Sequence, residues 1–270
     1  MKLELKEMLD TLRRVHPLIH EITNYVTAND CANITLAAGA SPVMADALEE
    51  AEEMTAISQA LVLNLGTLNR EKLKSMLLSG KKAGETGIPV IFDPVGCGSA
   101  RFRTGAAVQI LHEVRPSVVR GNLSEVGSLL GMPLHTRGVD ASEERCRWTA
   151  RQMAETAAQQ WDCIVAVTGK TDIISDGRQT LCIDNGCSAM ACITGTGCMC
   201  TAVMGAFCGA CPAHLLEAAA AALIFTGLCG ELAWETAGWD GLGSFHWKFM
   251  DAAGRMTGEQ LEKGAKYHEA

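Results

Sequence analysis

Short apolar runs, each about the length of a β-strand, recur along the first part of the chain. They are continuous rather than alternating, which predicts strands buried on both faces, as in a parallel sheet. The runs are Ala60–Leu65, Pro89–Phe92, Ser117–Val119 and Cys163–Val167. Segments with helical spacing separate them: Arg70–Gly84, Thr104–Val114, Ser124–Leu130 and Ser142–Gln160, the last opened by Ser142 as a cap. This β–α alternation predicts an open α/β sheet with right-handed crossovers.

The pattern changes after Thr168. Asp172–Ser175 and Arg178–Ile183 flank Asp176-Gly177, a dipeptide typical of a two-residue hairpin turn. We therefore expect antiparallel strands at one edge of the sheet. The remaining segments have helical patterns, over Cys198–Cys208, Ala213–Thr236 and Gly243–Met256. Because no linker, repeat or low-complexity tract divides the chain, we expect a single domain over residues 1–270.

Composition narrows the class of protein. With 48% hydrophobic and 20% charged residues, the 270-residue chain is expected to be globular. Its net charge of −8, without a long basic run, argues against a nucleic-acid partner. The N-terminus lacks the apolar core of a signal peptide, and the most apolar stretch, Ala218–Cys229, is too short to cross a bilayer. We expect a cytoplasmic protein with no membrane contact, and Ala218–Cys229 as a buried helix.

The chain contains twelve cysteines. In a reducing compartment most cysteines are small buried hydrophobic residues. Cys208 and Cys211 have CxxC spacing, but no second pair or suitably spaced histidine follows, which disfavours zinc. A redox or metal-binding protein that uses these two residues with Cys198 and Cys200 stays open as an alternative.

Familiar nucleotide-binding motifs are incomplete in this sequence. Gly169-Lys170-Thr171 matches the end of a P-loop, but position 164, where that motif requires glycine, is Ile164. The pairs Gly96/Gly98 and Gly195/Gly197 begin the dinucleotide-binding pattern without its third glycine. P-loop and Rossmann sites are therefore not expected.

Polar residues stand at the ends of three consecutive predicted strands. Asp93 follows the first, Asn122 and Glu125 follow the second, and Thr168 follows the third. Ligands bind at the carboxyl ends of parallel strands, and such groups suit Mg²⁺, its waters and phosphate. The alternative is local structure: Asp93 in a turn before proline, and Asn122 with Glu125 as a helix cap.

The segment Ile193–Cys200 reads ITGTGCMC. Gly195, Thr196 and Gly197 predict a backbone loop that opens onto a helix N-terminus, where unpaired N–H groups attract anions. Cys198 follows, where a phosphate-handling site usually has a carboxylate. A helix N-terminus lowers the pKa of a thiol, whereas nearby phosphate charge raises it, so thiol and thiolate both stay open.

Two of these motifs carry a resemblance. Asn122-x-x-Glu125, followed by Gly-Thr-Gly-x at a helix start, is similar to the paired signatures of ribokinase-like kinases, most of which have Asp at the fourth position. Nearly the whole chain resembles the hydroxyethylthiazole kinase family of thiamine biosynthesis, which has Cys there. The matching stretches are Ile22–Ala45, Ala60–Asn69, Pro89–Arg103, Val118–Val126, Val165–Asp172, ITGTGCMC and Gly241–Ala252.

The resemblance implies a fold, a reaction and an assembly. The fold is a three-layer α-β-α ribokinase-like domain with a mostly parallel central sheet and an antiparallel edge. The reaction is phosphoryl transfer from ATP, with Mg²⁺, to the hydroxyl of 5-(2-hydroxyethyl)-4-methylthiazole. The assembly is a homotrimer with active sites between subunits. The segment ITNYVTANDCAN is poor in charge, which fits burial against a partner.

The resemblance also implies roles by position. Those for ATP are Arg120, Thr168 and Asn122; those for Mg²⁺ and its waters are Asp93 and Glu125; those for the thiazole are Met44, Gly195, Asn24, Gly66 and Thr67.

The transition state of phosphoryl transfer is loose, so positioning and charge stabilisation dominate and early deprotonation is not required. Backbone N–H groups from Gly195 to Cys198 are expected to hold the transferred group, with Thr196 and Gly197 between them. Cys198 is predicted to be an auxiliary base rather than a covalent nucleophile.

Other functions on the same fold stay open. Kinases of pyrimidine or pyridoxal alcohols and ATP-dependent dehydratases of damaged nicotinamide cofactors carry an acid at the position of Cys198, which counts against them. A catalytically silent nucleotide sensor is a further alternative.

Overall fold

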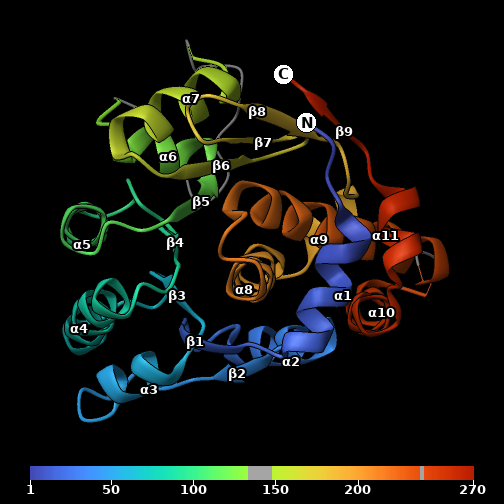
Figure 1. The fold of residues 1–270 in the computed structure, drawn as a ribbon. Helices are drawn as coiled ribbons and strands as arrows, with labels where there is room; N and C mark the ends of the chain where they lie inside the picture. Colours follow the sequence, from blue (N-terminus) through green and yellow to red (C-terminus); the bar gives the residue numbers. More distant parts are fainter. Residues whose placement is uncertain (133–147, 238–239) are drawn as a thin grey trace.

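The computed structural model describes residues 1–132, 148–237 and 240–270, and a nine-stranded sheet forms the centre of this part (Figure 1). The strand order is β2-β1-β3-β4-β5-β6-β7-β8-β9. Strands β1 to β6 all run parallel. Strands β7, β8 and β9 are antiparallel to their neighbours. The strands are β1 (Leu18–Ile22), β2 (Ser41–Val43), β3 (Ala60–Asn64), β4 (Val90–Asp93), β5 (Val118–Asn122), β6 (Ile164–Thr168), β7 (Asp172–Ser175), β8 (Thr180–Ile183) and β9 (Tyr267–Glu269). The predicted parallel sheet with an antiparallel edge is confirmed.

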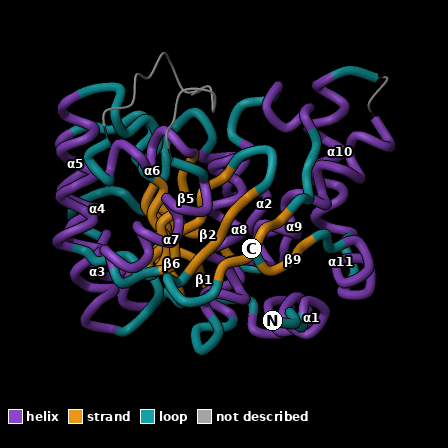
Figure 2. The backbone as a smooth tube through the Cα atoms, turned by 90° about the horizontal axis from the view of Figure 1, so that it is seen from above, coloured by secondary structure: helices purple, strands orange, loops and turns teal. Residues whose placement is uncertain are grey.

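Helices cover both faces of the sheet, which gives three layers (Figure 2). On one face lie α3 (Ala51–Ile57), α4 (Arg70–Thr86), α5 (Arg101–Glu113), α6 (Leu123–Leu129) and α7 (Ala150–Trp161). On the other lie α1 (Leu5–Val15), α2 (Ala28–Ala38), α8 (Thr196–Ala210), α9 (Leu215–Ala237), α10 (Leu242–Arg255) and α11 (Gly258–Gly264). A 3₁₀ turn, Ser188–Cys192, precedes α8. The three-layer arrangement is the predicted one.

Continuous apolar strands explain why both faces are covered. Every residue of β3 is buried, and successive side chains enter opposite cores: Val62 lies in one hydrophobic cluster, and Leu61 and Leu63 lie in the other. A strand that is apolar on both sides must be covered on both sides.

Strand β1 was not predicted, because its centre is polar. His20 and Glu21 are both buried. The ring of His20 lies 2.8 Å from the hydroxyl of Thr55 and 2.6 Å from the carbonyl oxygen of Ala45. Glu21 accepts a 2.7 Å hydrogen bond from the hydroxyl of Thr35. Tertiary partners therefore satisfy the ring of His20 and one oxygen of Glu21, groups that read as exposed in the sequence. The other unpredicted elements, β2, α3, α11 and β9, are short.

Two predicted segments differ from the described ones. Ser142, the predicted start of a helix, lies outside the described residues. Within them the helix α7 begins at Ala150, because Thr149 has extended backbone and forms a capping box with Gln152. The hairpin turn is also longer than predicted: the carboxylate of Asp176 accepts two backbone N–H groups, and β8 begins at Thr180 rather than Arg178.

Helix α9 is the one helix in the described ranges that is long and apolar enough to cross a membrane. Its stretch Ala218–Cys229, however, is buried against other elements of the protein. Phe225 of α9 packs edge-on against Phe207 of α8, with ring centroids 5.8 Å apart. The predicted buried helix is confirmed.

Helix α8 lies directly on the sheet through small residues spaced four apart. A Cβ atom on Gly205 would come within 2.5 Å of Cγ2 of Val62, and one on Gly209 within 3.1 Å of Cδ1 of Ile19. Thr201, one turn before Gly205, donates a hydrogen bond to Asp93 at the end of β4. This row of contacts brings the first turn of α8 to the carboxyl ends of the parallel strands.

We predict that Gly205→Ala lowers the free energy of unfolding by about 1–3 kcal/mol, because the added methyl group overpacks the helix–sheet interface. The control is Gly84→Ala in α4, where no atom lies within 4 Å of the added Cβ. That change should stabilise the protein by about 0.5–1 kcal/mol. Urea unfolding of both variants measures the difference, and an equal response would contradict the close contact of α8 with the sheet.

Candidate active site

The polar residues that the sequence predicts at strand ends lie together at the carboxyl ends of the parallel strands. Asn64 at the end of β3 is the register partner of Asp93 at the end of β4, and Asn122 on β5 pairs with Thr168 on β6. Because the strands run parallel, their carboxyl ends lie on the same side of the sheet. The first turn of α8 lies against these ends. Arg120, also on β5, extends into the same region and contacts Asp93.

Asp93 is the buried centre of this cluster. Its Oδ2 accepts hydrogen bonds from Asn64 Nδ2 at 3.0 Å and from Thr201 Oγ1 at 2.8 Å, and Arg120 Nη1 lies 3.7 Å away. Burial raises the pKa of Asp93 to about 7; the charge of Arg120 opposes this rise and that of Glu125 adds to it. Oδ1 is buried and has no hydrogen-bond partner among the residues that the structure describes. Oδ1 is therefore the oxygen that can take a ligand.

Glu125 and Asn122 form the helix cap that the sequence allowed. The Asn122 side chain accepts from the Glu125 N–H at 2.9 Å, and Glu125 Oε2 accepts from the Asn122 N–H at 2.9 Å. Glu125 Oε1 accepts from the N–H of Gly96, in the loop after Asp93, at 2.8 Å. The capping interpretation is confirmed, and each carboxylate oxygen keeps a second lone pair for another partner.

The predicted glycine loop forms the start of α8. Gly195 is the N-cap with φ of 92°, and no side chain caps the helix. The loop is tightly enclosed: a Cβ on Gly197 would lie 2.7 Å from Arg120 Nη1, and one on Gly195 would lie 2.6 Å from Cγ2 of Thr27. The N–H groups of Thr196, Gly197 and Cys198 lie in the first turn of α8, where a helix has no internal acceptors and favours an anion.

Two buried amides hold the sulfur of Cys198. Asn24 Nδ2 and Asn64 Nδ2 each donate to Sγ at 3.3 Å. Backbone donors fix the orientation of both amides, since Asn24 Oδ1 accepts from the N–H of Thr27 at 3.1 Å and Asn64 Oδ1 accepts from the N–H of Gly66 at 2.9 Å.

Burial raises the pKa of Cys198, and the nearby charge of Asp93 raises it further. Hydrogen bonds from Thr27, Asn24 and Asn64 oppose that rise without reversing it. Of the two forms that the sequence left open, the structure therefore favours the neutral thiol.

Apart from Gly195 at the start of α8, the residues predicted near the acceptor follow β1, β2 and β3. The hydroxyl of Thr67, a residue with φ of 48°, accepts from the N–H of Tyr25 at 3.3 Å. A Cβ on Gly66 would lie 2.7 Å from Cβ of Asn24, so these two loops touch. Met44 follows the edge strand β2, with 38% of its surface exposed, and is separated from Asn64 by β1.

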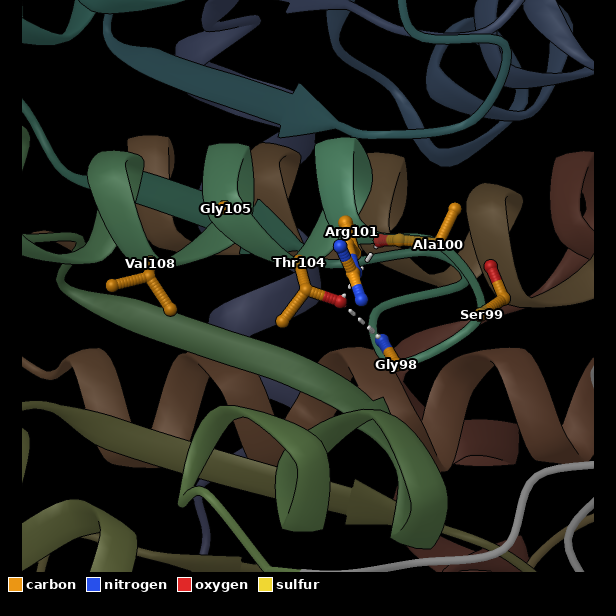
Figure 3. Close-up of a pocket in the computed structure, with 7 residues that line it drawn as sticks. All are labelled: Gly98, Ser99, Ala100, Arg101, Thr104, Gly105 and Val108. Atoms are coloured by element: carbon orange, nitrogen blue, oxygen red, sulfur yellow. Dashed lines mark hydrogen bonds between the residues drawn. The ribbon is translucent and has the colours of Figure 1, made fainter.

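A groove of about 550 Å³ lies at the start of α5 (Figure 3). It is open, and most of its lining residues are exposed. The hydroxyl of Thr104, one of the lining residues, makes two hydrogen bonds. It accepts from the N–H of Gly98 at 2.9 Å and donates to the carbonyl oxygen of Ala100 at 3.1 Å. Thr104 thereby holds the backbone at Gly98, two residues after Gly96. No predicted site residue lines this groove.

Comparison with known proteins identifies the family. The model of the "Hydroxyethylthiazole kinase family" matches residues 9–259. The chain belongs to the hydroxyethylthiazole kinase family. It is 48% identical to the hydroxyethylthiazole kinase of Ruminiclostridium cellulolyticum, over 98% of this chain and 97% of that protein. The solved structure of the hydroxyethylthiazole kinase protein from Pyrococcus horikoshii OT3 is 39% identical, with a TM-score of 0.89 over 98% of each chain.

A more distant structure shares the fold alone. The ADP/ATP-dependent NAD(P)H-hydrate dehydratase of Bacillus subtilis, co-crystallised with ATP/Mg²⁺, is 13% identical, with a TM-score of 0.59 over 90% of this chain and 89% of that one. Dehydratases of this kind were an alternative on sequence grounds. The family assignment now favours a kinase.

Sequence reasoning missed two residues that organise this cluster in the kinase. Asn64 contacts Asp93, Cys198 and Asn24, and Thr201 connects α8 to Asp93. A signal for Asn64 was present, because it ends its strand as Asp93 ends the next. Thr201 lies four residues after Gly197, on the same face of α8.

Glu21 is a second buried carboxyl close to this region. Within the described ranges its Oε2 has no hydrogen-bond partner. Burial raises the pKa of Glu21 to about 7, while the hydrogen bond from Thr35 opposes the rise. Glu21 lies on β1, three residues before Asn24.

We predict that Glu21 makes stability pH-dependent. Its pKa is higher in the folded than in the unfolded state, so its favourable contribution is full at low pH and is lost as pH rises from about 4.5 to 7. Glu21→Gln should therefore gain stability relative to wild type between pH 5 and pH 8, by ~3 kcal/mol. Denaturant unfolding at both pH values measures this gain. The exposed control Glu53→Gln should show none; an equal, pH-independent difference for both variants would refute the prediction.

Proposed function

We propose that this chain transfers the terminal phosphoryl group of ATP to the hydroxyl of 5-(2-hydroxyethyl)-4-methylthiazole. Membership of the hydroxyethylthiazole kinase family supports the reaction. The observation that carries the proposal is the position of the first turn of α8. This turn lies against Arg120 at Gly197, is joined to Asp93 through Thr201, and carries the sulfur of Cys198, which shares the amide of Asn64 with Asp93.

The phosphate side of the proposed site combines fixed positive groups. The N–H groups of residues 196–198 and the helix dipole favour negative charge at the start of α8. Arg120 lies against Gly197 in the same turn. In a loose transition state, charge spreads over the oxygens of the transferred group, where these donors would bind it. Thr168 and Asn122 are proposed to contact the rest of the nucleotide.

The residues present fit a magnesium ion. Asp93 offers one buried oxygen without a partner, and Glu125 lies close enough for its charge to affect Asp93. In the described part of the chain, no three His, Cys, Asp or Glu side chains gather as a metal site. Mg²⁺ commonly takes one or two carboxylates and completes its shell with water and substrate phosphate. When bound, it would neutralise charge on the phosphate oxygens.

Cys198 would face the acceptor hydroxyl. Its thiol is neutral near pH 7, because burial raises its pKa, and a neutral thiol is a poor base. Since the reaction does not require early deprotonation, we propose that Cys198 mainly orients the hydroxyl and assists its proton loss weakly. Asn24, Gly66, Thr67 and Gly195 would surround the thiazole.

The proposed active assembly is a homotrimer with sites between subunits. Apolar side chains remain exposed around the acceptor end: Tyr25 at 79%, Val26 at 57% and Met44 at 38%. A second copy packed there would bury them and complete the thiazole pocket. Light scattering should give three times the 28.7 kDa chain mass, whereas a monomer would contradict the assembly.

Two substitutions of Cys198 test its role. Cys198→Ala should lower kcat by less than the ~10²–10⁴-fold typical of losing a general base. Cys198→Asp should retain activity, because the amides of Asn24 and Asn64 can donate to a carboxylate. Steady-state kinetics of both variants decide the question. An inactive Asp variant, or a phosphorylated Cys198 in the wild type, would exclude the proposed role.

ADP release with a panel of alcohols tests the substrate. We expect turnover with the thiazole alcohol well above that with pyrimidine or pyridoxal alcohols. Preference for another alcohol would overturn the acceptor assignment, and the absence of turnover with every alcohol would favour a non-catalytic nucleotide-binding protein. Tightly bound zinc at one equivalent in the purified protein would instead favour the metal-binding alternative.

A further inference from the structure

Lys72 is a buried charge that the proposed chemistry does not use. It lies in the first turn of α4, and only 7% of its side chain is exposed. Burial of an ammonium group is costly unless its donors are paired. Nζ donates a 2.8 Å hydrogen bond to the carbonyl oxygen of Thr23 and lies 3.6 Å from the carboxylate of Asp46.

These contacts join the loops at the acceptor end of the site. Thr23 directly precedes Asn24, whose amide donates to the sulfur of Cys198. Asp46 is two residues after Met44. The third loop is held at the start of α4 itself, where Asn69 caps the helix by accepting from the Lys72 N–H at 2.8 Å. That loop contains Gly66 and Thr67.

The bond to Thr23 carries most of this effect. Asp46 is 57% exposed, so its ion pair is screened by solvent and contributes little. The bond to the Thr23 carbonyl is short, buried and charge-assisted, which is the stronger class of hydrogen bond. It fixes the peptide group that joins Thr23 to Asn24, and so the backbone from which the Asn24 side chain extends.

We propose that Lys72 is a positioning residue for the phosphoryl acceptor. It sets the loop of Thr23 and Asn24 against the loop of Gly66 and Thr67, and so determines the shape of the pocket in front of Cys198. Lys72 acts through Asn24 and does not need to touch the substrate. The inference rests on the proposed function in one respect, the use of these loops to bind the thiazole alcohol.

Kinetics of three variants test the proposal. Lys72→Met removes the charge and keeps the length of the side chain, Lys72→Arg keeps a cation, and Lys74→Met is the control from an exposed position on the same helix. We expect Lys72→Met to raise the KM for the thiazole about tenfold or more, as for loss of one charge-assisted bond, with the KM for ATP unchanged within about twofold. Lys72→Arg should recover part of the loss, and Lys74→Met should match wild type.

A purely structural role predicts a different result. Lys72→Met would then yield less folded protein, but the folded fraction would have the wild-type KM for the thiazole, and this outcome would overturn the proposal. If Lys72→Met does not fold, Lys72→Gln, which lacks the charge, carries the same comparison, and a wild-type thiazole KM in that variant would also overturn the proposal.

Hydrogen exchange separates this inference from the proposed function. In the Lys72 variants, amides of residues 23–27 should exchange faster than in wild type, while those of α7 should not change. Unchanged exchange at residues 23–27 would refute the positioning role even in an active enzyme. A wild-type protein that does not phosphorylate the thiazole would refute the proposed function, whatever the exchange shows.

Discussion

The close approach of helix α8 to the sheet is the constraint on which the proposed site depends. A Cβ on Gly205 would clash with Val62 of β3, one on Gly209 would press against Ile19 of β1, and one on Gly197 would displace the side chain of Arg120. A helix with larger residues on this face would lie farther from the sheet, and its first turn would not reach the strand ends. Packing of α8 against the neighbouring apolar helix α9 helps to hold this position. The backbone N–H groups of the first turn are thereby fixed before any ligand binds.

Within this frame, single polar groups serve both the fold and the proposed chemistry. Oδ2 of Asp93 anchors α8 through Thr201 and β3 through Asn64, while Oδ1 is left without a partner. Glu125 caps α6 and holds the Gly96 loop with the same carboxylate. Opposing electrostatic effects act at Asp93, because burial favours the neutral acid and Arg120 favours the carboxylate. A bound cation would act in the same direction as Arg120.

Patterns in the sequence predicted the parts of the fold that depend on local or periodic signals. Continuous apolar runs identified β3 to β6. The polar residues that follow these runs correctly indicated a cluster at the carboxyl ends of the strands. Strand β1 was missed because the hydrogen-bond partners of His20 and Glu21 lie on α2, α3 and the loop after β2, which a local pattern does not reveal. The contact of Lys72 with Thr23 joins residues 49 positions apart and has no local signal. The assignment of the acceptor residues came from the family resemblance, since periodicity and composition say nothing of a thiazole.

A crystal structure with Mg²⁺, a non-hydrolysable ATP analogue and the thiazole alcohol would test the central claim most directly. The terminal phosphate should lie within about 3 Å of the backbone nitrogens of residues 196–198, with the acceptor hydroxyl beside the sulfur of Cys198. A terminal phosphate bound away from the first turn of α8, for example beside the exposed side chain of Lys170, would contradict it.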